Sequence, residues 1–361
     1  METTIITRHH VAKIVQEKGF DQFMDRMIDR LGAAFAAPEG HGVTPVRDGF
    51  LRGPGDTAIL EWMPHHQPDD SITIKTVGYT PTNPTTHRLP TIIGTMTRYD
   101  DVTGRLLAVC DGILPTAIRT GAASAIASRL LARPDSRVLG LVGAGAQAVT
   151  QAHALSRVFP LERILVHDIE PAHEASFAER AEFLGIDVEV ASVADIEAAA
   201  DILCTVTSVG VGDGPVLLGE RLRPHVHINA IGADLIGKFE VPKAVLKSAF
   251  VTPDHRGQAL REGECQQLTD ADLGPDLMTL CARPELAEAE RERVTVFDST
   301  GFALEDHVAL DVLLELAAGG GGGGPRGGGP PPGGAPRPMP GPTPAFRSCC
   351  FGCSRRGRGR G

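Results

Sequence analysis

The chain lacks a long apolar run and a disulfide framework. No stretch approaches the roughly 20 apolar residues that a helix needs to cross a membrane. The N-terminus METTIITRHH has no charged start followed by an apolar segment, so no signal peptide is expected. Four of the seven cysteines are scattered along the chain, as in reduced cytosolic enzymes (Cys110, Cys204, Cys265 and Cys281). These features predict a cytoplasmic protein that does not contact a membrane.

The chain also lacks a metal motif and an excess of basic residues. Cys350 and Cys353 form a lone C-x-x-C without a second pair or nearby histidines, so no metal is expected. From Gly319 onward there are seven arginines and no acids, which leaves 28 basic against 45 acidic residues before it. This excess of acidic residues before Gly319 argues against nucleic acid as a partner. A small anionic substrate must then be held by a few well-placed cations.

Composition and pattern divide the chain into three parts. Residues 319–361 contain 16 of the 42 glycines and 9 of the 27 prolines, which predicts a disordered tail. Residues 119–299 alternate strands with helices, which predicts a Rossmann-type, doubly wound parallel sheet. Residues 1–118, together with a last helix in 300–318, read as an α+β domain with an amphipathic helix and an antiparallel sheet. The predicted fold class is therefore α/β with two domains.

The segment GLVGAGAQA predicts a dinucleotide site. Gly143, Gly145 and Ala148 form G-x-G-x-x-A directly between a strand, RVLGLVG, and a helix that opens near Ala146. The first glycine allows the tight turn, the second lets the backbone approach a pyrophosphate, and the alanine lets helix and sheet pack closely. Asp168 ends the next strand and is placed to accept hydrogen bonds from a ribose 2′-hydroxyl, which favours NAD over NADP. An ordinary βα turn is the alternative interpretation.

Several charged residues lie in apolar surroundings. Lys75 lies mid-strand in SITIKTVGYT, Glu61 lies in AILEWMPHH, Arg119 opens an alanine-rich helix, and Asp234 follows HINAIGA. Each alone is also consistent with a solvent-facing or turn residue. Together they predict cations that hold a carboxylate and acids that handle an amine, beside a nicotinamide.

The sequence resembles the ornithine cyclodeaminase/μ-crystallin family. The matching segments are EWMP, ITIKTVGYTPTNP, LPTIIGT, AIRTGAASA, LVGAGAQA, HINAIGADLIGK, EGECQQL and VFDSTGFALED. Within the family it is most similar to the bacterial branch that forms L-pipecolate from L-lysine for antibiotic biosynthesis. The resemblance implies an NAD-dependent cyclodeaminase, which is an ammonia-lyase. In such an enzyme NAD accepts a hydride from the substrate and later returns it to the same carbon. It also implies a homodimer formed through the first domain.

The resemblance further implies roles for individual residues. Asp234 is the expected catalytic acid and base, Arg47, Lys75 and Arg119 the expected carboxylate ligands, Glu61 a carboxylate near the amines, and Thr300 a contact of the substrate side chain. The expected cofactor contacts, besides Gly143 and Gly145, are Thr91, Arg119, Ala146, Gln147, Asp168, Thr207, Ile228, Asn229, Ala230, Ile231, Lys238 and Ser299.

Three other functions fit the same sequence. L-Ornithine is an alternative substrate, because one methylene in an apolar pocket discriminates by only about 1–3 kcal/mol. A cyclic-imine reductase or amino-acid dehydrogenase would use the same scaffold but consume nicotinamide cofactor. A non-catalytic binding protein is the third alternative, and the joint presence of Lys75, Arg119 and Asp234 argues against it.

Overall fold

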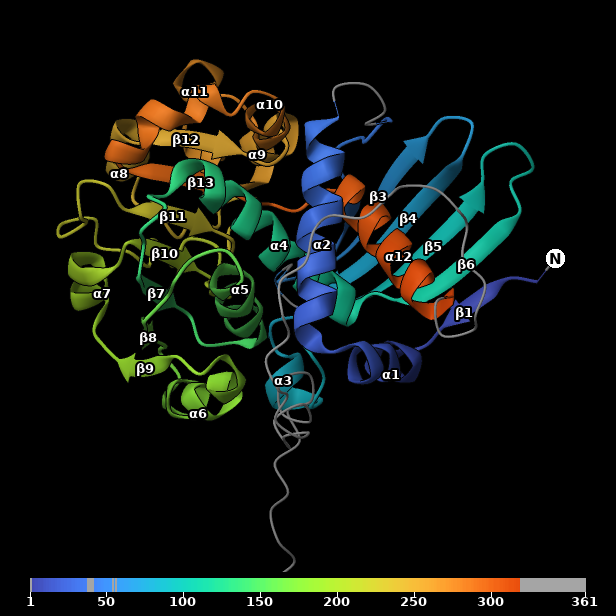
Figure 1. Cartoon of the computed structure of the whole chain (residues 1–361), viewed down its shortest axis with the longest axis horizontal. Coiled ribbons are helices and arrows are strands. Elements are labelled where there is room, and N and C mark those ends of the chain that lie inside the picture. The colour runs from blue at the N-terminus through green and yellow to red at the C-terminus, as the bar shows by residue number, and fades with distance from the viewer. Residues whose placement is uncertain (1, 38–41, 54, 56, 319–361) are drawn as a thin grey trace, which may run out of the picture.

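The computed structural model describes residues 2–37, 42–53, 55 and 57–318. The predictions of a disordered tail and of a weak C-x-x-C signal lie outside the described residues. The chain contains two sheets, and helix α2 (Phe20–Ala36) lies between them in the view of Figure 1. In the described ranges, no helix combines the length and apolarity that crossing a bilayer requires.

The first sheet has six strands in the order β1-β6-β5-β4-β3-β2. They span β1 (Thr4–Ile6), β2 (Asp48–Arg52), β3 (Ala58–Gln67), β4 (Ser71–Tyr79), β5 (Ile92–Asp100) and β6 (Leu106–Asp111). The predicted hairpin of β5 and β6 is confirmed. The antiparallel pairing predicted for β4, β5 and β6 is also confirmed. Strands β1, β2 and β3 were not predicted, and β1 runs parallel to β6 at the edge of the sheet.

Helices cover one face of this sheet. The helices before the second sheet are α1 (Arg8–Lys18), α2 (Phe20–Ala36), α3 (Asn83–Thr86) and α4 (Ile113–Leu131). Helix α2 buries Phe23, Met27 and Leu31 at helical spacing, and each such side chain contributes roughly 1.5–3 kcal/mol. The last helix, α12 (Ala303–Ala318), returns from the second sheet to pack on α2, α4, β3 and β4 (Figure 1).

The second sheet confirms the predicted doubly wound parallel fold. Its seven strands are all parallel, in the order β12-β13-β11-β10-β7-β8-β9. They span β7 (Val138–Val142), β8 (Arg163–His167), β9 (Asp187–Val190), β10 (Ile202–Thr205), β11 (His227–Ala230), β12 (Phe250–Pro253) and β13 (Thr295–Asp298). The chain direction across the sheet reverses between β7 and β10, and ligands of such folds bind at the carboxyl ends of the strands beside that point.

The helices around the second sheet are mostly short. They are α5 (Ala146–Ser156), α6 (Pro171–Ala181), α7 (Val193–Ala199), α8 (Lys243–Ser248), α9 (Arg256–Glu262), α10 (Leu277–Ala282) and α11 (Glu285–Glu288). Helix α4 lies between the two sheets (Figure 1). The prediction that Arg119 opens this helix is wrong, because it begins at Ile113 with Pro115 in its first turn. Proline is tolerated there, where its missing N–H would have no helical partner.

Candidate active site

The glycine-rich turn joins β7 to α5 at the reversal point. Gly143 has φ +104°, and a Cβ there would lie 2.7 Å from the carbonyl oxygen of Val206, just beyond β10. A side chain is therefore excluded by both backbone strain and close approach. A Cβ on Gly145 would meet nothing within 4 Å. This open space lies at the N-terminus of α5, where free N–H groups and the helix dipole favour a phosphate. The residues present fit a dinucleotide.

Asp168 lies directly after β8, beside this turn. Its Oδ2 accepts a hydrogen bond from the backbone N–H of Ala144 at 2.6 Å, and its Oδ1 accepts one from Glu170 at 2.8 Å. A carboxylate has about four lone-pair positions, so these two bonds fix its orientation and leave acceptors free. Its place next to the glycine turn is the place expected for a ribose-binding carboxylate.

Several other predicted cofactor residues lie at the carboxyl ends of strands in the second sheet. Ser299 donates its N–H to Ala230, and Ile231 donates its N–H to Thr205, which ties the strand ends together. The hydroxyl of Thr207 donates to Glu240 at 2.6 Å.

Two predicted contacts lie deeper, within β11: Ile228 and Asn229 are fully buried, and the Asn229 amide donates to Ser128. Gln147 donates weakly to the carbonyl of Ala117 at 3.4 Å. Thr91 directly precedes β5 and accepts from the N–H of Thr80.

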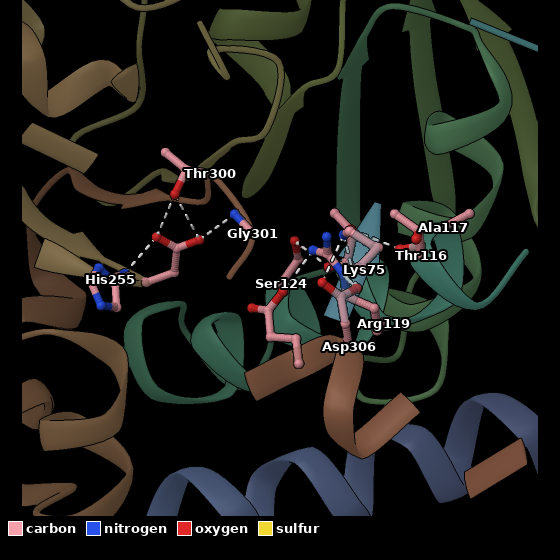
Figure 2. A network of polar contacts seen from close by, with 12 residues as sticks. Lys75, Thr116, Ala117, Arg119, Ser124, His255, Thr300, Gly301 and Asp306 are labelled. Carbon is pink, nitrogen blue, oxygen red and sulfur yellow. Dashed lines mark hydrogen bonds and ion pairs between the residues drawn. The ribbon is translucent and has the colours of Figure 1, made fainter. Parts of the chain in front are cut away.

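Lys75, Arg119 and Asp306 meet where β4, α4 and α12 converge (Figure 2). Lys75 faces inward, with Met63 and Met96 as its register partners on the neighbouring strands, and its side chain is 2% exposed. Its Nζ lies 2.7 Å from Asp306 Oδ2 and 2.9 Å from Oδ1. The Nε of Arg119 lies 3.2 Å from Asp306 Oδ1. The structure thus brings two of the predicted carboxylate ligands together on one acid.

A second acid, Glu305, completes this cluster. It accepts from Arg119 Nη1 at 2.6 Å. Burial raises the pKa of Glu305 to about 8, against the effect of Arg119. Burial also lowers the pKa of Lys75 to about 8, and the charge of Arg119 adds to that fall while Asp306 opposes it. The cluster thus places two cations, Lys75 and Arg119, against two acids, Asp306 and Glu305, in buried surroundings.

Arg47 forms the centre of a second cluster. Its Nε lies 2.7 Å from Glu262 Oε1 and 3.2 Å from Glu61 Oε1. Its Nη2 donates to the backbone oxygen of Asp234 at 2.7 Å, and its Nη1 donates to the backbone oxygen of Thr300 at 3.1 Å. The predicted residues Arg47, Glu61, Asp234 and Thr300 therefore lie together.

The carboxylate of Asp234 points toward Lys238. Its Oδ1 lies 3.0 Å from Lys238 Nζ, and the Asp234 side chain is 27% exposed. The ammonium of Lys238 also lies over the ring of Tyr79, 4.9 Å from its centroid. The pKa of Lys238 is raised: burial lowers it, but the nearby Asp234 and Tyr79 raise it by more. Asp234 is thus a partly accessible acid just beyond the carboxyl end of β11.

The turn after β13 links the two clusters. The Thr300 hydroxyl donates to Asp254 at 3.0 Å and accepts from Gln258 at 2.8 Å, while Asp254 also accepts the N–H of Gly301 at 2.6 Å (Figure 2). Gly301 has φ +73°, and a Cβ there would lie 2.5 Å from Arg119 Nη1. Since Thr300 contacts Arg47 and Gly301 lies against Arg119, this turn sets the spacing of the two guanidinium groups.

The sequence analysis missed four acids of the site. They are Asp254, Glu262, Glu305 and Asp306, all buried. Glu305 and Asp306 open an apolar helix, where acids are usual for a helix N-terminus. Their burial depends on pairing with strands and helices far away in the sequence. The available signal was the apolar character of the helix that follows them, in which Val308, Leu310 and Leu313 are buried. In the described part of the chain, no group of three or more histidines, cysteines or acids is arranged to hold a metal ion.

Comparisons with known proteins agree with this architecture. Residues 8–321 match the model of the ornithine cyclodeaminase/mu-crystallin family. The chain is 52% identical to the L-lysine cyclodeaminase of Streptomyces rapamycinicus over 88% of this chain and 93% of that protein. A lysine cyclodeaminase structure, solved to explain recognition of L-lysine, L-ornithine and L-2,4-diaminobutyric acid, is 57% identical, with a TM-score of 0.86 and coverage of 88% and 93%. An archaeal alanine dehydrogenase dimer with bound NAD is 30% identical, with a TM-score of 0.77 and coverage of 90% and 98%.

Proposed function

Because the chain belongs to the ornithine cyclodeaminase/mu-crystallin family, we propose that it is an NAD-dependent cyclodeaminase. It converts L-lysine to L-pipecolate and ammonia. The observation that carries the proposal is the presence of two buried charged clusters, joined by the turn after β13, in a chain with a dinucleotide turn. One cluster pairs Lys75 and Arg119 with two acids, and the other pairs Arg47 with Glu61 and Glu262.

The cofactor is proposed to be NAD, held by the turn at Gly143–Gly145 and by Asp168. When bound, NAD supplies a hydride acceptor that later returns the hydride to the same substrate carbon. The chain's own residues orient that carbon. Arg119, from helix α4, presents a planar, bidentate donor to the substrate carboxylate, and Lys75, from strand β4, adds a point charge. Such a clamp brings reacting atoms within roughly 3–3.5 Å, which supplies much of the rate acceleration.

Asp234 is proposed to move the protons of the α-nitrogen. It accepts a proton from the α-ammonium, which frees the nitrogen lone pair to expel the hydride from Cα. The side-chain amine then attacks Cα, and the α-nitrogen departs as ammonia. Lys238 holds the carboxylate of Asp234 in place. Arg47 fixes the backbone of Asp234 from the other side.

L-Ornithine is the second candidate substrate. The related lysine cyclodeaminase structure concerns recognition of L-lysine, L-ornithine and a shorter diamino acid, so one such pocket accommodates several chain lengths. The test is a mass-resolved product assay with each diamino acid and a trace of NAD. We expect pipecolate from lysine in large excess over NAD, with no accumulation of NADH. Faster formation of proline from ornithine would make ornithine the substrate. If the only activity found is reduction of an added cyclic imine with consumption of NADH, the protein is a reductase.

We further propose that residues 1–118 with 300–318 form the substrate and dimerisation domain and residues 119–299 the NAD domain. The outer face of the first sheet supports a dimer with a second copy of this chain. Phe50, Leu60 and Ile93 lie in one cross-strand row through Gly78, on the face opposite α2 and α12. Their side chains are 66%, 39% and 36% exposed. Exposed apolar side chains grouped on one face of a sheet are typical of a protein interface.

Replacing Leu60 with glutamate is expected to convert the dimer to a monomer. The charge would be buried in the centre of the interface without a partner, which costs several kcal/mol. Light scattering after size exclusion measures the mass. Val102→Glu is the control, because Val102 is 84% exposed at the turn between β5 and β6 of the same sheet. A Leu60→Glu protein that remains dimeric would place the interface elsewhere.

A further inference from the structure

Glu240 is a fully buried acid whose side chain joins two loops of the second sheet. Its Oε1 accepts the backbone N–H of Thr207 at 2.8 Å and the Thr207 hydroxyl at 2.6 Å. Its Oε2 accepts the backbone N–H of Gly232 at 2.7 Å. The Thr207 hydroxyl oxygen accepts from the N–H of Val209, so its own hydrogen is available for Glu240. Three donors converge on one carboxylate, which suits an ionised acid because that form only accepts.

The two loops leave neighbouring strands at the same level. Thr205 and Ala230 are the last register partners of β10 and β11. Thr207 and Gly232 each lie two positions beyond that pair. The Glu240 carboxylate therefore spans the two chains just after the hydrogen-bonded ladder between the strands ends.

The backbone of Glu240 is itself held in place. Its N–H donates to the buried carboxylate of Glu264 at 2.6 Å, and its carbonyl oxygen accepts the N–H groups of Val216 and Leu217 at 2.9 and 3.1 Å. Glu264 also accepts from the side chain of Gln267 at 2.9 Å. Because the backbone of Glu240 is bonded on both sides, its carboxylate has a fixed position, and so do the two loops that are bonded to it.

These two loops carry residues with different tasks in the proposed reaction. Thr207 is an expected contact of the cofactor, and Gly232 lies two positions before Asp234, the proposed proton acceptor of the α-nitrogen. Hydride transfer and proton transfer act on one substrate carbon and its nitrogen, so the cofactor and the acid must keep a fixed spacing. Buried groups that hydrogen-bond the site residues provide support of this kind.

We propose that Glu240 is a positioning residue that sets the spacing between the cofactor and Asp234 by holding Thr207 and Gly232. This inference rests on the proposed function. Glu240 itself contacts neither substrate nor cofactor and takes up no proton. Its removal should slow the chemical step much more than it weakens NAD binding, because the turn at Gly143–Gly145 and Asp168 still hold the dinucleotide.

The test compares Glu240→Gln with the unaltered protein. Glutamine keeps the shape of the side chain but replaces one acceptor oxygen with an NH2 donor, which then faces a donor of Thr207 or Gly232. We expect kcat for L-lysine to fall about 100-fold, the loss that a misplacement of about 1 Å produces. Calorimetry should show a nearly unchanged Kd of NAD.

Glu197 provides the matched control. It is also a fully buried acid, and it accepts the backbone N–H groups of Leu218, Gly219 and Arg221 at 2.8, 2.7 and 3.3 Å. None of these three partners is a predicted site residue. Glu197→Gln should therefore lower the Tm about as much as Glu240→Gln does and leave kcat nearly unchanged.

Two further variants keep the negative charge but disturb the contact. A Cβ on Gly232 would lie 2.3 Å from Glu240 Oε1, so Gly232→Ala displaces the carboxylate. Glu240→Asp is one methylene shorter and cannot reach both loops from the same backbone position. Both variants should lower kcat with little change in the Kd of NAD, and Gly232→Ala keeps the test intact if Glu240→Gln does not fold. A normal kcat in both would show that the charge matters and not the contacts, which overturns the inference.

The other outcomes separate this inference from the proposed function. Equal losses of kcat in Glu240→Gln and Glu197→Gln, a normal kcat in Glu240→Gln, or a loss confined to NAD binding would overturn the inference alone. If the unaltered protein reduces a cyclic imine with NADH but does not cyclise diamino acids, the proposed function fails, and the same variants test the inference on hydride transfer to the imine. If the unaltered protein catalyses neither reaction, both fail.

Discussion

Replacing Asp234 with asparagine is expected to lower L-lysine turnover by at least about 1000-fold. Asparagine keeps the shape and can still accept a hydrogen bond from Lys238, which lies 3.0 Å from the Asp234 carboxylate. It cannot take up a proton, and general acid and base catalysis contributes about 10²–10⁴ in rate. Asp234 is proposed to act on the α-nitrogen both before hydride removal and when ammonia leaves, so both steps fail.

Cofactor binding should be unaffected by this change. The dinucleotide turn and Asp168 lie at the ends of β7 and β8, two strands away from β11 in the sheet. Lys238, an expected cofactor contact that is paired with Asp234, keeps a hydrogen-bond acceptor in the asparagine variant. We would measure ammonia release for turnover and calorimetry for the Kd of NAD. Asp187→Asn, at an exposed position of the edge strand β9, is the matched control and should behave as the unaltered protein. An Asp234→Asn protein within tenfold of normal activity would remove Asp234 from the chemistry.

Replacing Lys75 with methionine is expected to lower both stability and activity. The change leaves Asp306, which is fully buried, with only Arg119 at 3.2 Å. Removing one partner of a buried ion pair lowers the free energy of unfolding by about 3–5 kcal/mol. Because Asp306 keeps its contact with Arg119, we expect a loss near the lower end of this range. The substrate carboxylate also loses one of its two cations, so kcat/KM should fall at least about 100-fold, or about 2.7 kcal/mol.

A double variant separates these two effects. In Lys75→Met/Asp306→Leu the Lys75–Asp306 pair is replaced by apolar side chains, which is often neutral or stabilising. Arg119 loses its contact with Asp306 and keeps the one with Glu305. We therefore expect the Tm to recover in part and kcat/KM to remain low. Arg98→Met is the matched control, because Arg98 pairs with Asp311 and so also joins the first sheet to α12. It should lower the Tm without a comparable fall in kcat/KM. Recovery of activity in the double variant would contradict the assignment of Lys75 to the substrate.

The parts of the fold that were predicted correctly depend on neighbours in the sequence. Strand β7, the turn at Gly143 and helix α5 form one continuous segment, and their pattern is complete without any distant partner. Strand β4 was likewise predicted from its alternating pattern, but which of its two faces is buried was not, and Lys75 lies on the buried one. The family resemblance is confirmed as well.

The features that were missed depend on distant partners. Strands β1 and β2 have three and five residues and lie at the two edges of the sheet, so neither carries a full alternating pattern. Asp306 is separated from Lys75 by 231 positions and Glu262 from Arg47 by 215. Nothing in either local segment shows that an acid there is buried against a cation. The pairing of each predicted cation with an acid therefore emerges only from the folded chain.

The central claim is that the hydride and the side-chain nitrogen both stay with the substrate. The most direct measurement uses L-lysine carrying deuterium at C2 and ¹⁵N at the side-chain nitrogen, with a trace of unlabelled NAD. Mass spectrometry of the products should show pipecolate that retains the deuterium at C2 and the ¹⁵N in its ring, together with unlabelled ammonia. Pipecolate without deuterium, or ammonia carrying ¹⁵N, would contradict the account.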